Sequence, residues 1–109
     1  MTDISLAHIG RTRTTVGAIL CAAHRSRDGR LHGHTWRVWV TFPCLGGPLD
    51  ATTLKATLER FLSDMGDHGV LPDRLAWGEA IAEDVGRGLV ADYVRVERPD
   101  EMIVAEWFA

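Results

Sequence analysis

Cysteine is scarce in this 109-residue chain: it has only Cys21 and Cys44, and neither stands in a Cys-x-x-Cys or Cys/His motif. Two such residues make no disulfide framework, so we expect free thiols that pack as small core residues. No apolar run is long enough to cross a bilayer. The N-terminus also lacks the apolar stretch of a secretory signal. We therefore expect a cytoplasmic protein that does not bind membranes.

A strong charge imbalance is missing as well. The chain has 12 basic and 15 acidic residues, and its net charge of -3 gives no general attraction to nucleic acid. Low-complexity segments, internal repeats and linkers are absent, and the length suits one hydrophobic core. These features predict a single domain over residues 1–109 that has no nucleic-acid partner.

Two strands are predicted in the first half of the chain, over residues 15–24 and 31–42. Asp28-Gly29 lies between them, and Asp-Gly between two strands is typical of a tight hairpin turn. Alternation in the second strand places every other side chain on one face. The residues on that face are His32, His34, Trp36, Val38, Val40 and Phe42.

Two helices and a second hairpin are predicted in the rest of the chain. Asp50 is expected to cap a helix that ends at Gly66, and a second helix is expected near residues 78–90. The segments DYVRVER and EMIVAEWF alternate like a closing hairpin around PDE. The order ββ–αα–ββ predicts an α+β fold, in which a four-stranded antiparallel sheet carries two helices on one face. The free edges of so small a sheet are either guarded or paired with another copy.

Three of the five histidines, His24, His32 and His34, lie within eleven residues. His32 and His34 are two apart on a strand, so their imidazoles project from one face, and the hairpin brings His24 beside them. Three imidazoles make a three-nitrogen site for Zn²⁺ with an open fourth position, which is the catalytic pattern. The alternative from these residues alone is a His-x-His pair that is merely packed on a strand.

The segment AAHRSRDGRLHGHTWRVWV resembles the signature of the 6-pyruvoyl-tetrahydropterin synthase and 6-carboxytetrahydropterin synthase family. In that family a strand ending in AAH precedes C-x-x-x-H-G-H, an aromatic residue and alternating valines. Later segments resemble further family motifs in the same order: PLDATTLKATL, GDHGVLPD, WGEAIAEDV and VRVERPDEMIVAEW. The resemblance runs from residue 17 over nearly the whole chain. It implies a 6-pyruvoyl-tetrahydropterin synthase-like domain with the tunnelling fold (T-fold), in which subunits, usually a homohexameric dimer of trimers, join their sheets into a barrel.

By that resemblance, His24, His32 and His34 are the ligands of a Zn²⁺ cofactor. The implied substrate is a small pterin triphosphate, 7,8-dihydroneopterin triphosphate, whose side-chain hydroxyls the zinc would hold. The implied activity is that of a carbon-carbon and carbon-oxygen lyase of the 6-carboxytetrahydropterin synthase type. Its product would enter 7-deazapurine synthesis of the queuosine type.

The resemblance also assigns supporting residues. Asp67-His68 matches a family pair in which a carboxylate orients a proton-carrying histidine, whereas a loop histidine by itself is usually just solvated. Glu97 is the candidate for the carboxylate that anchors the pterin, although it follows Val96 directly where the family has one residue between. Glu79, near the start of the second helix, either lines the site or is simply favoured by the helix dipole.

Asp28 occupies the position of the family's catalytic cysteine. An exposed carboxylate is a weak base, but partial burial strengthens it, and some family members carry Glu there and form 6-hydroxymethylpterin. The alternative is that Asp28 only shapes the turn. Cys21 lies on the opposite strand face from His24 and cannot simply substitute. Three functions therefore stay open: the 6-carboxytetrahydropterin synthase type, an acid-for-cysteine variant that forms 6-hydroxymethyl-dihydropterin, and a non-catalytic protein that binds zinc and pterin.

Overall fold

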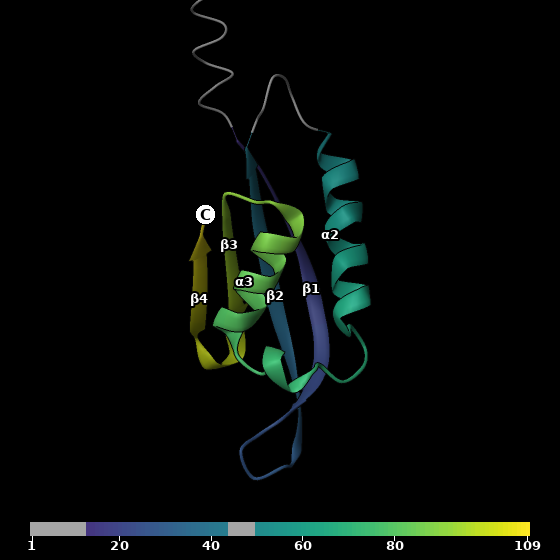
Figure 1. Ribbon diagram of the computed structural model, residues 1–109, viewed down its shortest axis with the longest axis vertical. Coiled ribbons are helices and arrows are strands. Elements are labelled where there is room, and N and C mark those ends of the chain that lie inside the picture. Colours follow the sequence, from purple (N-terminus) through teal and green to yellow (C-terminus); the bar gives the residue numbers. More distant parts are fainter. Residues whose placement is uncertain (1–12, 44–49) are drawn as a thin grey trace, which may run out of the picture.

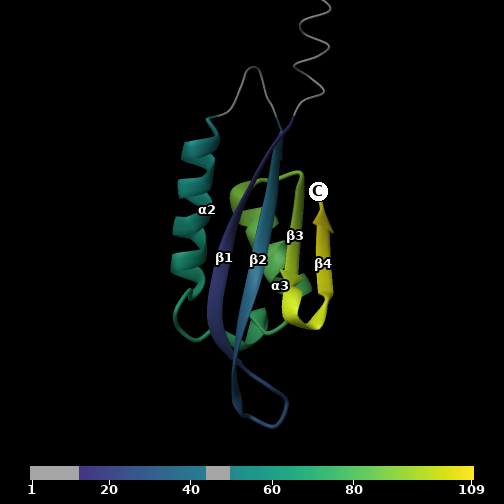
Figure 2. The ribbon, with the colours of Figure 1, turned by 180° about the vertical axis from the view of Figure 1, so that it is seen from behind.

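The computed structural model describes residues 13–43 and 50–109 (Figure 1). Four strands form one antiparallel sheet in the order β1-β2-β3-β4, and the two helices lie on one of its faces (Figures 1 and 2). This confirms the predicted α+β architecture. The elements in chain order are β1 (Arg13–Arg25), β2 (Leu31–Pro43), α2 (Ala51–Met65), the 3-10 turn η1 (Asp73–Leu75), α3 (Gly78–Leu89), β3 (Tyr93–Arg98), the 3-10 turn η2 (Pro99–Glu101) and β4 (Ile103–Phe108). Cys44 lies outside the described residues.

The β1–β2 hairpin is the longest paired unit of the fold. Each strand has 13 residues, and the pairing runs without a break from Arg13 opposite Pro43 to Arg25 opposite Leu31. The predicted turn forms at its tip, where Gly29 has a φ of 83° and the Ser26 N–H donates to the Arg30 carbonyl at 2.9 Å. Glycine adopts positive φ at little steric cost, so Asp-Gly suits this turn.

Helix α2 begins and ends where the sequence predicts. The Asp50 side chain accepts a hydrogen bond from the Thr52 N–H at 3.1 Å and so caps the first turn. At the other end the Gly66 N–H donates to the Leu62 carbonyl at 3.1 Å, with φ at 140°. One side of the helix packs on the sheet, and Leu58 and Leu62 are its fully buried residues.

The core lies between the sheet and the helices. Helix α3 packs on β3 and β4, with Ile81 and Val85 fully buried. Trp36 is the largest fully buried side chain and comes from the predicted apolar face of β2. The other face of the sheet carries no helix (Figure 2). Its exposed apolar side chains include Ile19, Trp39, Val104 and Phe108. No helix in residues 13–43 and 50–109 is long and apolar enough to cross a membrane.

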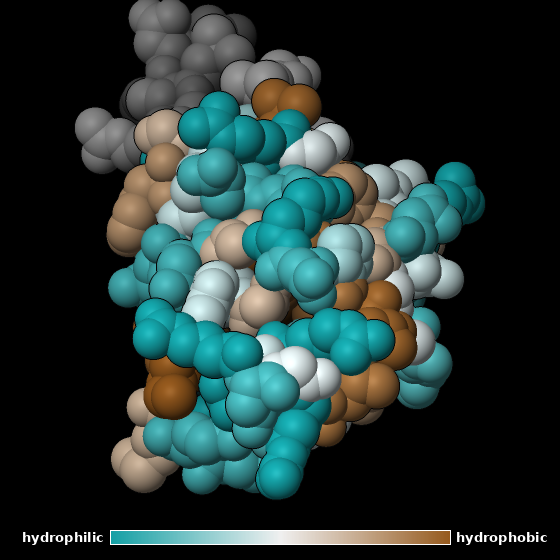
Figure 3. Space-filling view, turned by 60° about the horizontal axis from the view of Figure 1, so that its bottom comes forward, coloured by the Kyte–Doolittle hydropathy of each residue, from teal (hydrophilic) through white to brown (hydrophobic). Residues whose placement is uncertain are grey.

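The second hairpin forms as predicted, but PDE makes a 3-10 turn rather than a simple loop. Strands β3 and β4 pair from Tyr93 opposite Phe108 to Arg98 opposite Ile103. Alternation along β3 buries Val94 and Val96 in the core and leaves Glu97 on the helix-free face. Polar side chains predominate at the end of the molecule that carries the β1–β2 turn, and hydrophobic atoms form separate patches there (Figure 3).

Val90 ends α3 in the left-handed conformation, with φ 53° and ψ 50°, and its side chain is 80% exposed. A β-branched residue is strained in this conformation, where glycine is not. We predict that Val90→Gly raises the free energy of unfolding in urea by about 1 kcal/mol. Val90→Ala removes the same methyl groups but keeps Cβ, so its free energy of unfolding should rise by less than that of Val90→Gly. An equal gain in both variants would show that backbone strain is not the cause.

Candidate functional site: a histidine cluster at the hairpin base

The β1–β2 register brings the three histidines together. His24 lies directly opposite His32, and His34 follows two residues later on the same face of β2. The ring centroids of His24 and His34 are 4.8 Å apart, those of His24 and His32 6.2 Å, and those of His32 and His34 6.4 Å. The hairpin therefore makes the predicted cluster of imidazoles.

The three histidines differ in burial. His24 is buried and His34 is partly buried, and both rings meet the indole of Trp36 edge-on at centroid distances of 6.1 and 5.4 Å. His32 lies at the exposed end of the cluster. Both ring nitrogens of His24 are buried and have no hydrogen-bond partner. Unpaired buried polar atoms are unfavourable, which makes His24 the strongest sign of a ligand at this place.

Burial and nearby positive charge lower the pKa values of His24 and His34 and so favour their neutral forms. Desolvation lowers the pKa of His24, and the Arg98 guanidinium and His32 lower it further. Desolvation likewise lowers the pKa of His34, followed by the effects of Arg98 and His24, with Glu101 acting in the opposite direction. Neutral imidazole is the form that coordinates metal ions.

The cluster has the donor set of a three-histidine zinc site. Tetrahedral zinc with Zn–N bonds of about 2.1 Å places imidazole centroids about 5 Å apart. The His24–His34 distance of 4.8 Å matches this spacing, whereas His32 lies more than 6 Å from both rings. Within residues 13–43 and 50–109, however, no three His, Cys, Asp or Glu side chains are already arranged to hold a metal ion. The rings fit zinc in number and chemistry, and His32 must move closer and the side chains must rotate to make their nitrogens converge.

Arg98 is a member of the cluster that the sequence analysis missed. It ends β3 on the core face, and its Nη2 lies 3.1 Å from His34 Nδ1 and 3.4 Å from Nε2. The same Nη2 donates to Glu101 Oε1 at 2.9 Å. Val94 and Val96 face the core, so the alternation of side chains along β3 places Arg98 on the same face. This alternation is the sequence signal that could have identified Arg98. Its charge opposes a metal cation, so metal binding requires the guanidinium to turn away from His34.

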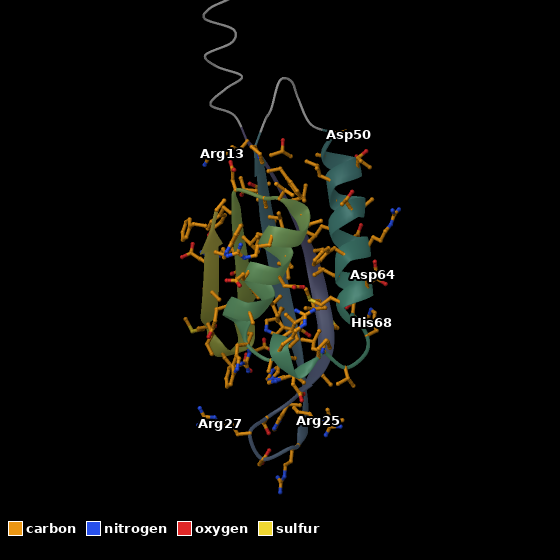
Figure 4. All side chains as sticks on the ribbon, in the orientation of Figure 1. Arg13, Arg25, Arg27, Asp50, Asp64 and His68 are labelled. Atoms are coloured by element: carbon orange, nitrogen blue, oxygen red, sulfur yellow. The ribbon has the colours of Figure 1, made fainter. Side chains whose placement is uncertain are left out.

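Asp67 and His68 lie at the outer edge of β1, where the loop after α2 docks on the strand. Asp67 Oδ1 accepts from the Cys21 N–H at 2.9 Å, while Oδ2 lies 3.5 Å from His68 Nε2. The His68 N–H donates to the Cys21 carbonyl, and its φ is 61°. The His68 side chain itself is exposed, at the loop below α2 (Figure 4). The Asp67 carboxylate thus lies beside the His68 imidazole, and the role of the pair in proton transfer stays a prediction.

A hollow of about 440 Å³ lies between His68 and the histidine cluster, because both His34 and His68 line it. Glu101 and Cys21 also contribute to its wall. The Cys21 thiol lies beside Thr35 Oγ1, 3.6 Å away, on the helix-free side of the strand. Cys21 therefore borders the hollow although its side chain projects away from His24.

Asp28 is at the exposed tip of the hairpin. Its Oδ1 accepts hydrogen bonds from Ser26 Oγ and from the Arg30 N–H, the latter at 3.1 Å, and Oδ2 lies 3.7 Å from Arg30 Nε. The Ser26 and Arg30 hydrogen bonds lower the pKa of this carboxyl group. Exposure and a lowered pKa make a weak base, so the geometry favours the turn-shaping role of Asp28. The neighbouring Arg25 donates from its Nη1 to the Gly29 carbonyl at 3.2 Å, whereas Arg27 points away from the hairpin (Figure 4).

The two glutamates predicted to bind substrate, Glu97 and Glu79, lie in different parts of the structure. Glu97 lies on the helix-free face, where Trp39 Nε1 donates to its Oε1 at 2.7 Å and Arg95 Nη2 lies 3.6 Å from its Oε2. It is not brought together with the histidines of its own chain. Glu79 is in the first turn of α3 and borders a second hollow together with His24.

Comparison with protein families finds no family whose model matches this chain. No curated protein matches it either. The histidine geometry therefore carries the functional argument.

The lowered pKa values of His24 and His34 make stability depend on pH. Below their ordinary value of 6.5, the unfolded chain binds protons on these histidines that the folded chain resists, so folding stability falls as pH falls. We predict that urea unfolding in EDTA shows a lower free energy at about pH 5.5 than at about pH 7.5. The difference in unfolding free energy between these two pH values should be smaller in a His24→Gln, His34→Gln double variant. An unchanged pH dependence in that variant would refute this origin.

Proposed function

We propose that this protein is a zinc-dependent lyase of the 6-carboxytetrahydropterin synthase type, acting on 7,8-dihydroneopterin triphosphate. The observation that carries the proposal is the cluster of His24, His32 and His34, in which the buried nitrogens of His24 have no partner. The resemblance of the sequence segments supplies the substrate class. Zinc bound there would acidify substrate hydroxyls and stabilise the negative charge that forms when a proton leaves.

His68 is our candidate for the proton carrier. It borders the same hollow as His34, and its partner Asp67 is fixed by the Cys21 N–H. The carboxylate can orient the imidazole and stabilise its protonated form, as in other acid–base pairs. In this assignment Asp28 closes the hairpin and so preserves the register that gathers the zinc ligands.

The placement of Glu97 supports an assembly in which sites lie between subunits. Glu97 cannot meet the histidines of its own chain from the helix-free face. In the described part of the chain β4 pairs only with β3, and the bare face exposes Trp39 and Phe108. Free edges and an uncovered apolar face favour sheet pairing between copies. We propose a T-fold barrel, as a homohexameric dimer of trimers, in which Glu97 of one copy anchors the pterin at a neighbour's zinc site.

A non-catalytic role is the second candidate. It is favoured by two observations: Asp28, at the position of the family's catalytic cysteine, is held in a turn, and Arg98 contacts His34. A protein of this kind would bind zinc and pterin without turnover. The acid-for-cysteine variant remains the alternative if Asp28 leaves its turn contacts in the assembled enzyme.

Zinc binding can be tested directly. We predict close to one zinc per chain in purified protein reconstituted with zinc, because three imidazoles on one face of the hairpin suit this ion. The His32→Ala, His34→Ala double variant should lose most of it, as measured by atomic emission after gel filtration. His68→Ala is the matched control and should keep its zinc. Stoichiometric zinc in the double variant would exclude the three-histidine site.

The reaction can be tested by incubating the zinc-loaded protein with 7,8-dihydroneopterin triphosphate and identifying the product by mass. We predict that His68→Ala lowers turnover about a hundredfold or more, the usual contribution of a general acid–base group. Asp28→Asn should keep most activity, because Asn-Gly suits the same turn.

The opposite pattern, with activity lost in Asp28→Asn and kept in His68→Ala, would favour the acid-for-cysteine variant. No turnover by a wild-type protein that binds both zinc and pterin would favour the non-catalytic role.

A further inference from the structure

Arg98 lies beside two hollows of the structure. The first, of about 440 Å³, is bordered by His34 and by Glu101, the carboxylate with which Arg98 is paired. The second, of about 250 Å³, is bordered by His24, by Arg98 itself and by Glu79 in the first turn of α3. A carboxylate thus borders each hollow, and both hollows adjoin the histidine cluster.

The contacts of Arg98 hold its guanidinium against the cluster. Nη2 lies 3.1 Å from His34 Nδ1 and 2.9 Å from Glu101 Oε1. Zinc bound to His34 would bring two like charges as close together as the partners of an ion pair. Repulsion at that range is strong even where the effective dielectric constant is high. Arg98 therefore cannot keep this position when zinc is bound.

The second hollow offers the guanidinium another position. Arg98 already lines this hollow, and 26% of its side chain is exposed, so the core does not lock it in place. Its Nε is buried without a hydrogen bond, so this group loses no partner when the side chain moves. The aliphatic part of an arginine packs well on apolar surface. Such surface is present in the wall of the hollow, from Val96, Ile103 and Ala105.

Glu79 is available to pair with the guanidinium in that second position. Its side chain is exposed, and among the residues that the structure describes it forms no ion pair. An arginine and a carboxylate that border one small hollow can meet by side-chain rotation alone. The chain therefore provides Arg98 with one carboxylate in each of two positions.

We propose that Arg98 competes with zinc for the histidine cluster and that Glu79 is the positioning residue that relieves this competition. When zinc binds, the Arg98 guanidinium leaves His34, enters the second hollow and pairs with Glu79. The inference rests on the proposed zinc site and does not depend on lyase activity. It gives Glu79 a role in metal binding that is exerted through Arg98.

The zinc affinity of the full chain tests this inference, measured by competition with a chromophoric chelator after folding is checked by circular dichroism. Arg98→Gln removes the competing charge and should bind zinc about tenfold more tightly or better. Arg98→Lys keeps the charge and should gain less. Glu79→Gln removes the receiving carboxylate and should bind zinc about threefold more weakly or worse, within the range of an exposed ion pair.

The Arg98→Gln, Glu79→Gln double variant separates this mechanism from a general effect of charge. Without the guanidinium Glu79 has nothing to receive, so adding Glu79→Gln to Arg98→Gln should leave the affinity unchanged. A long-range attraction between Glu79 and zinc would instead cause the same loss in both backgrounds. Glu83→Gln is the matched control, because Glu83 lies one turn later on α3 and pairs with Arg87 at 3.7 Å. It should bind zinc as the wild type does.

The inference is overturned if Arg98→Gln binds zinc no more tightly than the wild type. It is equally overturned if Glu79→Gln has the same effect with and without Arg98. Either result would leave zinc binding by the histidines intact. If neither the wild type nor any variant binds zinc, the zinc site itself is wrong and this inference fails with it.

Discussion

The pairing register of β1 and β2 is the constraint on which the site depends. It sets His24 opposite His32, keeps His34 on the same face, and continues into the core through Trp36. A slip of one residue would move every side chain of a strand to the other face of the sheet. The Asp28-Gly29 turn fixes the register at one end, and the buried alternation of β2 fixes it at the other. The same hairpin thus determines both the strand pairing of the sheet and the geometry of the histidine cluster.

The site also buries polar atoms that make no hydrogen bond, which lowers the stability of the fold. The nitrogens of His24, the indole N–H of Trp36 and Arg98 Nε are buried without partners beside one another, whereas the apolar core around them is well packed. Such groups lower stability unless a ligand satisfies them. A metal bound by His24 would satisfy one of its two nitrogens. Arg98 contacts both His34 and Glu101, and its charge lowers the pKa values of His24 and His34.

The sequence predicted those features that local rules determine. Asp50 and Gly66 bound α2 because capping chemistry acts over a few residues, and the period-two alternation of β2 gathered the histidines. Long-range contacts were harder to foresee: the bond from the Cys21 N–H to Asp67 links residues 46 apart. The alternation of Val94 and Val96 places Glu97 and Arg98 on opposite faces of β3, but the family motif points to Glu97 alone. The turn contacts of Asp28 depend on Ser26 and Arg30, which no motif singled out.

The central claim is that three imidazoles of one hairpin bind one zinc ion, and X-ray absorption at the zinc edge tests it most directly. The account predicts a four-coordinate zinc with three nitrogen ligands at about 2.0–2.1 Å and one exchangeable oxygen. In His24→Gln one nitrogen ligand should disappear from the first coordination shell. Sulfur scattering at about 2.3 Å, or an all-oxygen shell that His24→Gln leaves unchanged, would contradict the account.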